Sequence, residues 1–401
     1  MKIAVFHNLP SGGGKRALYE FSKELKKRGF ILDAFVPSTA NELFLPLDSV
    51  VHRKFIYPIK SLPPYLNKKG IRWFYYNNSL PLALALTQKK IAHDINNGNY
   101  QLAFVHHSIV TQSPFILKYL KIPSLYFIQE PLRYIHEHPL MEEPCDLTFR
   151  KTYFSNVRKF YSHTLFKSID ESNITHATRL LVNSYYSHES VMRAYGLNSF
   201  VSYLGVDREI FKPDKDIEKE YVIVSVGRLL PQKGFRFIIK ALGQLRNIKK
   251  PKLIIIGDTD NSNEKHIVTT LAKENGVDLD IKIDISDKEL TKYYTMAALV
   301  VYAPYIEPFG LVPLEAMACG TPVIGVQEGG IRETIIHGVT GFLVERDVNK
   351  FADAIGSLLQ GQEKRALMGK NAIEYIKEKW TWQTATDNLI SHFNVLLNKY
   401  E

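Results

Sequence analysis

The stretch YAPYIEPFGLVPLEAMACGTPVI, residues 302–324, decides how the second half of this 401-residue chain folds. It begins at the end of ALVVYAP, an apolar run typical of a buried strand, and it ends in another such run, TPVIGV. Pro308 disfavours helix at Glu307, whereas Pro313 fits the first turn of a helix. The stretch therefore predicts a strand, a loop that carries Glu307, a helix that carries Glu315, and a second strand.

The same alternation of strand and helix extends outward through the whole chain. Short apolar runs are separated by segments with apolar residues at helical spacing, which predicts parallel sheets covered by helices on both faces. The polar, proline-containing segment 206–220 interrupts the pattern and is the best candidate for a linker. We therefore expect an α/β protein with two Rossmann-like, doubly wound domains, residues 1–205 and 206–379, which face one another across a cleft.

The composition is that of a globular protein, with 45% hydrophobic and 23% charged residues. The sequence contains no run of 18 apolar residues, so it predicts no membrane span. The first residues lack the features of a signal peptide. The two cysteines, Cys145 and Cys319, form neither a disulfide framework nor a metal-binding spacing. These features predict a cytoplasmic protein.

Basic charge is concentrated in the first half of the chain. Residues 1–205 contain 25 Lys+Arg and 14 Asp+Glu, whereas residues 206–401 contain 26 and 27. This asymmetry suggests an anionic partner for the first half, and a plain solubilising surface is the alternative. Residues 51–90 combine eight Lys/Arg with aromatic residues and contain no acidic residue. They suit peripheral contact with an anionic membrane. They also suit nucleic acid, although no recognised nucleic-acid motif is present, and burial of the aromatic residues in the core is the commoner alternative.

The two glutamates of the opening stretch indicate a ligand rich in hydroxyl groups and phosphate. Glu307 and Glu315 flank the backbone N–H groups of Phe309, Gly310 and Leu311, which approach a helix N-terminus and so form a natural anion site. Carboxylates accept hydrogen bonds from hydroxyl groups. A nucleotide sugar offers both hydroxyl groups and phosphates.

A second motif, GRLLPQKG at residues 227–234, supports the same ligand class. It follows the predicted strand EYVIVSV, and the carboxyl ends of parallel strands are where α/β sheets bind ligands. Arg228 and Lys233 can both contact phosphate there. By itself, an arginine and a lysine near a turn more often form solvated surface.

Together these motifs resemble a known enzyme family. GRLLPQKG, EPFGLVPLE and GTPVIGVQEGGIRETIIHGVTGFLV are similar to the retaining glycosyltransferases of family 4, also called glycosyl transferases group 1, which have the two-domain GT-B fold. The tail WTWQTATDNLISHF resembles the family's terminal helix, which implies that residues 380–401 cross back to the first domain. The family acts without a metal ion or other cofactor.

The resemblance also implies residue roles. Arg228 and Lys233 would hold the donor diphosphate, Glu307 would contact the transferred sugar, and Glu315 would accept hydrogen bonds from the ribose. The amides of residues 309–311 would contact sugar and phosphate. The glycine-rich first loop of the family corresponds here to three adjacent residues, Gly12, Gly13 and Gly14, which would let the backbone approach the acceptor and, at Gly13 and Gly14, bind the donor. Alone, such a triplet would indicate only a flexible turn.

The chain departs from the family pattern at several positions. Gln129 stands where many members have a histidine, and Asp284 stands where many have glycine, which leaves uridine or guanosine open as the donor base. The candidate residues on the acceptor side are therefore Gln129 and Arg133, with His106 and His107 as other sources of an imidazole. A structural or solvated role is the alternative for each histidine.

The sequence thus predicts a retaining, metal-independent hexosyltransferase. It would move a sugar from a UDP- or GDP-sugar to a glycan or lipid-linked acceptor in cell-surface polysaccharide synthesis, in the cytoplasm or peripherally at the inner face of the cell membrane. An inactive relative that binds nucleotide sugar or glycan is the first alternative. A glycosidase would not need the Arg/Lys pair, and a dehydrogenase would need a glycine fingerprint that is not convincingly present. The sugar, linkage and oligomeric state stay open.

Overall fold

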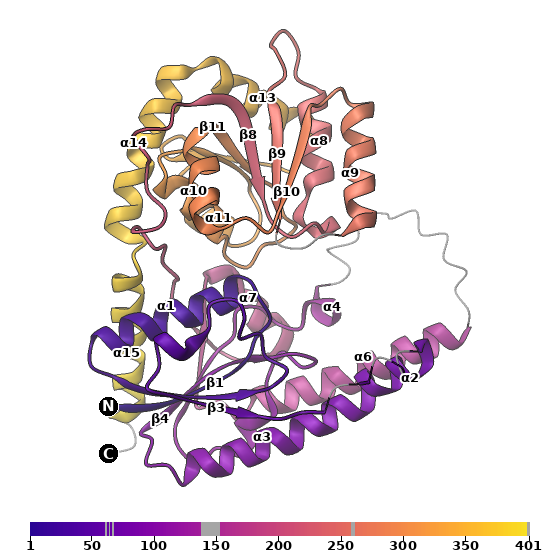
Figure 1. The fold of residues 1–401 in the computed structure, drawn as a ribbon, viewed down its shortest axis with the longest axis vertical. Coiled ribbons are helices and arrows are strands. Elements are labelled where there is room, and N and C mark those ends of the chain that lie inside the picture. Colours follow the sequence, from indigo (N-terminus) through magenta and orange to yellow (C-terminus); the bar gives the residue numbers. More distant parts are fainter. Residues whose placement is uncertain (61, 64, 66–67, 138–152, 258–260, 399–401) are drawn as a thin grey trace. The chain divides into compact units, whose positions relative to one another are not determined.

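The computed structural model describes the chain except for residues 61, 64, 66–67, 138–152, 258–260 and 399–401. The chain divides into two compact units. Among the described residues, unit 1 contains 1–137, 153–203 and 385–398, and unit 2 contains 204–257 and 261–384. Each unit is an α/β layer structure built on one parallel sheet (Figure 1).

Unit 1 has a seven-stranded sheet in the order β3-β2-β1-β4-β5-β6-β7, and every pairing is parallel. The strands are β1 (Lys2–Asn8), β2 (Ile31–Pro37), β3 (Arg53–Tyr57), β4 (Leu102–Ser108), β5 (Ser124–Phe127), β6 (Arg179–Val182) and β7 (Phe200–Val201). The helices are α1 (Gly13–Lys27), α2 (Lys69–Phe74), α3 (Leu80–Asn96), α4 (Arg133–His136), α6 (Tyr153–Ile174), α7 (Tyr185–Tyr195) and α15 (Trp382–Leu397). Short turns are η1 (Leu47–Ser49), the π-turn η3 (Tyr75–Ser79) and η4 (Phe115–Lys118).

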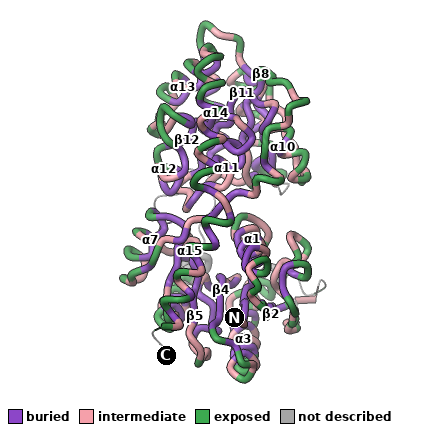
Figure 2. Tube along the Cα trace, turned by 90° about the vertical axis from the view of Figure 1, so that its left-hand side faces the viewer, coloured by how far each residue is buried: buried purple, intermediate pink, exposed green. Residues whose placement is uncertain are grey.

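Helices cover both faces of the unit 1 sheet, because alternate residues of its central strands point to opposite sides. On one side, Phe104 of β4 packs against Phe21 of α1 and Phe393 of α15. On the other side, Val105 lies in a core that includes Ile91 of α3 and Ile174 of α6. Figure 2 shows the central strands as buried tubes in this layered arrangement.

Unit 2 has a six-stranded parallel sheet in the order β10-β9-β8-β11-β12-β13. The strands are β8 (Glu220–Val226), β9 (Lys252–Gly257), β10 (Leu279–Ile283), β11 (Ala297–Tyr302), β12 (Val323–Val326) and β13 (Gly341–Val344). The helices are η5 (Pro231–Lys233), α8 (Phe235–Gly243), α9 (Ser262–Glu274), α10 (Asp287–Met296), α11 (Leu311–Ala318), α12 (Ile331–Thr334), α13 (Val348–Gln360) and α14 (Gln362–Lys379). None of the helices in the described parts of the chain combines the length and the apolarity that a membrane span requires.

The segment predicted as a linker, residues 206–220, is instead an integral part of unit 2. Val206 pairs with Thr381, and Phe211 is buried with its ring 6.1 Å from that of Tyr294. The polar composition of residues 206–220 suggested a linker, because the few apolar residues that attach this segment to unit 2 are spaced irregularly. Trp380, predicted with the terminal helix, also lies in unit 2, and α15 begins two residues later.

Two fully buried histidines make unit 1 sensitive to acid. Burial lowers the pKa of His7 to about 4, and it lowers that of His106 well below the usual value. Both residues are therefore neutral in the folded state at pH values where the unfolded chain would bind a proton. Burial of Asp170 raises its pKa to about 6, which acts in the opposite direction and offsets part of the effect.

We expect unit 1 to lose stability as the pH falls from about 6.5 to 4, by ~3 kcal/mol for His7 alone. The measurement is hydrogen exchange of unit 1 amides at pH 7.5 and 5.0, corrected for intrinsic rates. His106→Phe should reduce the pH dependence, because Phe cannot titrate and the site is lined by Phe104 and Phe127. An unchanged pH dependence in this variant would contradict the assignment.

Candidate functional site

The loop after β11 and the loop after β8 meet at the carboxyl edge of the unit 2 sheet. β8 and β11 are adjacent and parallel, so both loops leave the sheet at the same edge. Lys233, the last residue of η5, places its Nζ 2.8 Å from Oε2 of Glu307. Both side chains are partly buried, and Arg228 follows β8 with an exposed side chain. The predicted loop position of Glu307 is therefore confirmed, and the structure brings it together with Lys233.

Gly234 allows these two loops to touch. Its φ is +72°, and a Cβ at this position would lie 1.9 Å from the carbonyl oxygen of Ala303. Any other residue would push the loops apart. The N–H of Tyr305 donates to the carbonyl of Gln232 over 2.9 Å and closes the contact.

The loop after β12 supports Glu307 from another side. The N–H of Gly330 donates to the carbonyl of Glu307 over 2.8 Å. A Cβ on Gly330 would lie 2.2 Å from the carbonyl oxygen of Pro308, and one on Gly329 would lie 2.3 Å from that of Glu307. The two glycines of the EGG motif thus serve close backbone packing, a role that the family resemblance did not specify.

Arg346, just after β13, stabilises the loop after β11. It was not among the site residues predicted from the sequence. Its guanidinium donates to the carbonyls of Ala303 over 3.0 Å and Pro304 over 2.8 Å. It also forms a two-pronged ion pair with Glu328, at 2.8 and 2.7 Å, and lies 3.9 Å from the centre of the Tyr305 ring. Its position two residues after GFLV, the end of the third family motif, was the one sequence feature that could have indicated it.

Glu315 and Phe309 occupy more buried positions than their predicted ligand contacts suggested. Glu315 lies in α11, as predicted, and its Oε2 accepts a 3.0 Å hydrogen bond from the hydroxyl of buried Tyr294. The ring of Phe309 is buried 5.6 Å from that of Trp380, so only its backbone can contribute to a ligand site. Gly310 caps α11 with φ +99°.

Asp284, the departure from a family glycine, adopts a positive φ of 55° directly after β10. Its N–H donates to the carbonyl of Gly257 over 2.8 Å. Glycine enters this region most readily, and Asp is among the side chains that tolerate it. The backbone geometry therefore accommodates the substitution.

In unit 1, the expectation that Gly12, Gly13 and Gly14 form a loop is only partly correct. Gly12 has φ +123° and precedes the helix, but Gly13 and Gly14 are the first two residues of α1. A Cβ on Gly14 would lie 3.2 Å from the side-chain amide of Gln129. Glycine therefore lets Gln129 lie against the first turn of α1, and the structure brings these two predicted residues together.

The two adjacent histidines of β4 point to opposite sides of the sheet. His107 lines a cavity of about 430 Å³ at the carboxyl end of β4, together with Tyr76, Thr111 and Glu130. His106 is fully buried, with its ring 4.5 Å from that of Phe104 on the other face. The suggestion that His106 contacts an acceptor is therefore wrong, because the alternation of the strand turns it into the core.

Arg133 lies at the start of α4 and is engaged by acidic neighbours. Its Nε donates to Glu137 over 2.7 Å, and one terminal nitrogen lies 3.5 Å from Glu130. Arg133 therefore has its charge balanced within unit 1. It does not line the 430 Å³ cavity, although Glu130 and Leu132 do.

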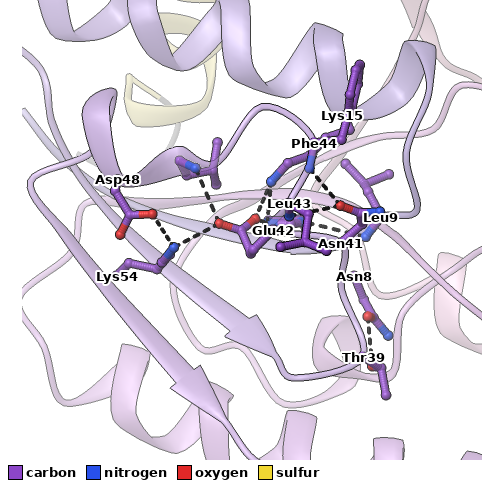
Figure 3. A network of polar contacts seen from close by, with 12 residues as sticks. Asn8, Leu9, Lys15, Thr39, Asn41, Glu42, Leu43, Phe44, Asp48 and Lys54 are labelled. Atoms are coloured by element: carbon purple, nitrogen blue, oxygen red, sulfur yellow. Dashed lines mark hydrogen bonds and ion pairs between the residues drawn. The ribbon is translucent and has the colours of Figure 1, made fainter. Parts of the chain in front are cut away.

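A buried polar network next to the glycine turn was not expected from the sequence. Figure 3 shows Glu42 between Lys15 and Lys54, and the carboxylate of Glu42 forms ion pairs with both. The N–H of Leu9 donates to His7 Nδ1, which leaves the ring proton on Nε2, 3.0 Å from Glu42. Burial acts to raise the pKa of Glu42, but hydrogen bonds from His7 and Lys15 hold that pKa well below its usual range.

This network fixes the loop after β2 onto the end of β1 and the start of α1. Thr39 donates to Asn8 over 2.9 Å, and the N–H of Asn41 donates to the carbonyl of Leu9 over 2.9 Å. Lys15 is completely buried in the first turn of α1, where a positive charge is unfavourable toward the helix dipole. Its charge therefore depends on Glu42.

Among the described residues, no group of three or more His, Cys, Asp or Glu side chains could hold a metal ion. The expectation that the chemistry needs no metal stays a prediction.

Comparison with known proteins confirms the family resemblance for the second half of the chain. Residues 207–375 match the family model Glycosyl transferases group 1. Over 251 residues the chain is 31% identical to a D-inositol 3-phosphate glycosyltransferase of Corynebacterium glutamicum, a match that covers 56% of this chain and 59% of that protein. The chain thus spans less than two thirds of the length of the curated relatives that it matches.

Solved structures confirm the predicted fold class over the whole chain. Sucrose-phosphate synthase from Thermosynechococcus elongatus superposes with a TM-score of 0.75 at 20% identity, over 99% of each chain. Anabaena HepE in complex with UDP and glucose gives 0.74 at 18% identity, over 98% of this chain and 100% of that one. The protein thus has the GT-B type of fold, with two Rossmann-like units.

The buried position of Lys15 predicts a large cost for removing its partner. Glu42→Ala should destabilise unit 1 by ~3–5 kcal/mol, because it leaves a buried charge with weaker compensation. Adding Lys15→Met should restore most of this loss. Asp48→Ala, which removes the exposed partner of Lys54, should cost less than ~1 kcal/mol. Urea unfolding of the variants checks the order, and a double variant as unstable as Glu42→Ala would contradict it.

Arg346→Lys should loosen the loop of residues 303–310. Lysine cannot bond two carbonyls and a carboxylate in the same fork-shaped geometry, so several hydrogen bonds are lost. We expect hydrogen exchange in this loop to accelerate at least tenfold, equivalent to about 1.4 kcal/mol. Arg246→Lys, at an exposed position of the same unit, is the matched control. Equal exchange rates in both variants would show that Arg346 does not stabilise this loop.

Proposed function

We propose that this protein is a retaining, metal-independent glycosyltransferase that uses a UDP- or GDP-sugar as donor. The single observation that carries the proposal is the Lys233–Glu307 pair at the carboxyl edge of the unit 2 sheet, within residues that match Glycosyl transferases group 1. A cation and a carboxylate held 2.8 Å apart offer one group for phosphate and one for sugar hydroxyls. Neither a plain scaffold nor a simple phosphate site needs both.

The charges of the site suit the departure of a nucleoside diphosphate. Breaking the bond from sugar to phosphate builds negative charge on the diphosphate and positive charge on the sugar. Arg228, Lys233 and the N-terminal amides of α11 would stabilise the first, and the carboxylate of Glu307 would stabilise the second. Arg346 and the close glycine contacts would keep these groups in place as the charge develops.

Glu315 would accept hydrogen bonds from the ribose, and its Oε2 already accepts one from the hydroxyl of Tyr294. The hydroxyl of Tyr294 fixes the carboxylate before any ligand arrives, which lowers the entropy cost of binding. The likeness to HepE, solved with UDP and glucose, supports a nucleotide-sugar donor, and uridine and guanosine both remain candidates for the base.

For the acceptor we propose a glycan or a lipid-linked saccharide in cell-surface polysaccharide synthesis, in the cytoplasm. The 430 Å³ cavity of unit 1 supports this choice. Its lining combines the rings of Tyr76, Tyr134 and Phe166 with the polar side chains of His107 and Gln112. Aromatic faces and hydrogen-bonding groups together suit a sugar ring better than a small anion.

A relative that binds nucleotide sugar without transferring it is the second candidate. Gln129 favours it, because glutamine stands where many members have a histidine and cannot exchange a proton. Its amide lies against Gly14 in unit 1 and can still donate a hydrogen bond to a hydroxyl group. Transfer therefore requires a direct test.

Arg228→Ala should weaken donor binding by about 10- to 100-fold, because a hydrogen bond to a charged group is worth ~1.5–3 kcal/mol. Calorimetric titration with UDP-glucose and GDP-mannose measures the change and identifies the base. Lys240→Ala, which removes an exposed lysine of the same unit, should leave binding unchanged. Equal affinities in wild type and Arg228→Ala would contradict the diphosphate site.

Donor turnover then separates a transferase from a binding protein. Wild type should release nucleoside diphosphate in excess EDTA, and Glu307→Gln should bind donor but turn it over at least a hundredfold more slowly. Binding without any release of diphosphate, with glycan and lipid-linked acceptors present, would favour the inactive relative. Activity restored only by Mg²⁺ or Mn²⁺ would contradict the metal-independent mechanism.

A further inference from the structure

Helix α3 carries apolar residues on two opposite sides. One side faces the core, with buried positions that include Leu80, Leu84 and Ile91. On the other side Leu82 and Leu86 are one helical turn apart, and each is 62% exposed. A helix at the surface of a globular protein normally has polar residues in such positions, so this outer apolar stripe requires a separate explanation.

The outer stripe continues into α2 through the π-turn η3. Phe74 is 58% exposed and Ile71 is 40% exposed, three residues apart on α2. A π-turn inserts about one extra residue into an α-helix. Phe74 and Leu82, eight residues apart, therefore have the phase of residues seven apart in a regular helix and lie on the same side. Figure 1 shows α2 and α3 in line along one edge of unit 1.

The charged residues of the segment that carries this stripe, from Lys68 to Lys90, are all basic. Lys68, Arg72, Lys89 and Lys90 are exposed next to it. The sequence contains no acidic residue between Asp48 and Asp94. Long basic side chains can cover apolar surface with their methylene groups while their charged ends reach outward. The surface is thus an apolar stripe bordered by cations.

Two other occupants fit this surface less well. In a symmetric dimer the same patch meets itself, so its cations would face identical cations. Single-stranded nucleic acid would suit the charge, but it binds by stacking on aromatic rings, and Phe74 is the one aromatic residue among the four stripe residues. An anionic lipid surface complements both features, since acyl chains accept Leu and Ile and headgroups attract Lys and Arg.

We propose that the α2–α3 surface, formed by Ile71, Phe74, Leu82 and Leu86 with the bordering cations, docks on an anionic lipid bilayer. The helix lies in the plane of the interface, the four apolar side chains enter the headgroup region, and the basic side chains contact lipid phosphates. This proposal is independent of the donor site, because every residue it uses belongs to unit 1.

The test is co-sedimentation of the full chain with vesicles of phosphatidylcholine alone or mixed with phosphatidylglycerol. Wild type should bind the mixed vesicles, and rising salt should release it. Leu82→Gln/Leu86→Gln should weaken binding at least tenfold. Lys89→Gln/Lys90→Gln should weaken it about thirtyfold, from ~1 kcal/mol for each basic residue. Leu367→Gln, at an exposed leucine of unit 2, should have no effect.

Equal binding of wild type to both vesicle types, or to neither at low salt, would overturn the proposal. A wild-type dimer that Leu82→Gln/Leu86→Gln converts to a monomer would assign the surface to a second copy instead. Thermal stabilisation by UDP-glucose, measured on the same samples, reports on unit 2 separately. A failure at the membrane is thus distinguishable from a failure of the proposed donor chemistry.

Discussion

The site in unit 2 depends on backbone segments that approach one another more closely than any side chain would permit. Gly234 contacts Ala303, and Gly330 contacts Pro308, at distances where a Cβ would overlap the neighbouring carbonyl. These contacts bring the loops after β8, β11 and β12 together at one edge of the sheet. Lys233 and Glu307 lie in two of these loops. Their ion pair therefore depends on close backbone contacts that only glycine permits.

Unit 1 fixes its glycine turn by a different physical means. There a buried ion pair, Lys15 with Glu42, joins the start of α1 to the loop after β2. Such a pair costs desolvation energy and contributes little net stability, but it strongly disfavours any arrangement that separates its charges. The outcome resembles that in unit 2, a loop held in one position at the carboxyl end of a parallel sheet.

Much of the fold could be predicted from the sequence because hydrophobic periodicity is a local property. The loop position of Glu307 and the helical position of Glu315 followed from two prolines, since proline acts on its immediate neighbours. The position of Gly13 and Gly14 was not predictable in this way. Glycine permits a turn but does not require one, and in the structure Gly13 and Gly14 begin α1, with Gly14 close to Gln129.

The sequence alone thus determined the parallel α/β architecture and the residue types of the candidate site, because strand, helix and turn preferences act over a few residues. Only the tertiary structure decided which polar groups meet. It paired Lys233 with Glu307 across 74 positions, joined Arg346 to the β11 loop, and turned His106 into the core. Such contacts depend on strand order and side-chain direction, which no local pattern encodes.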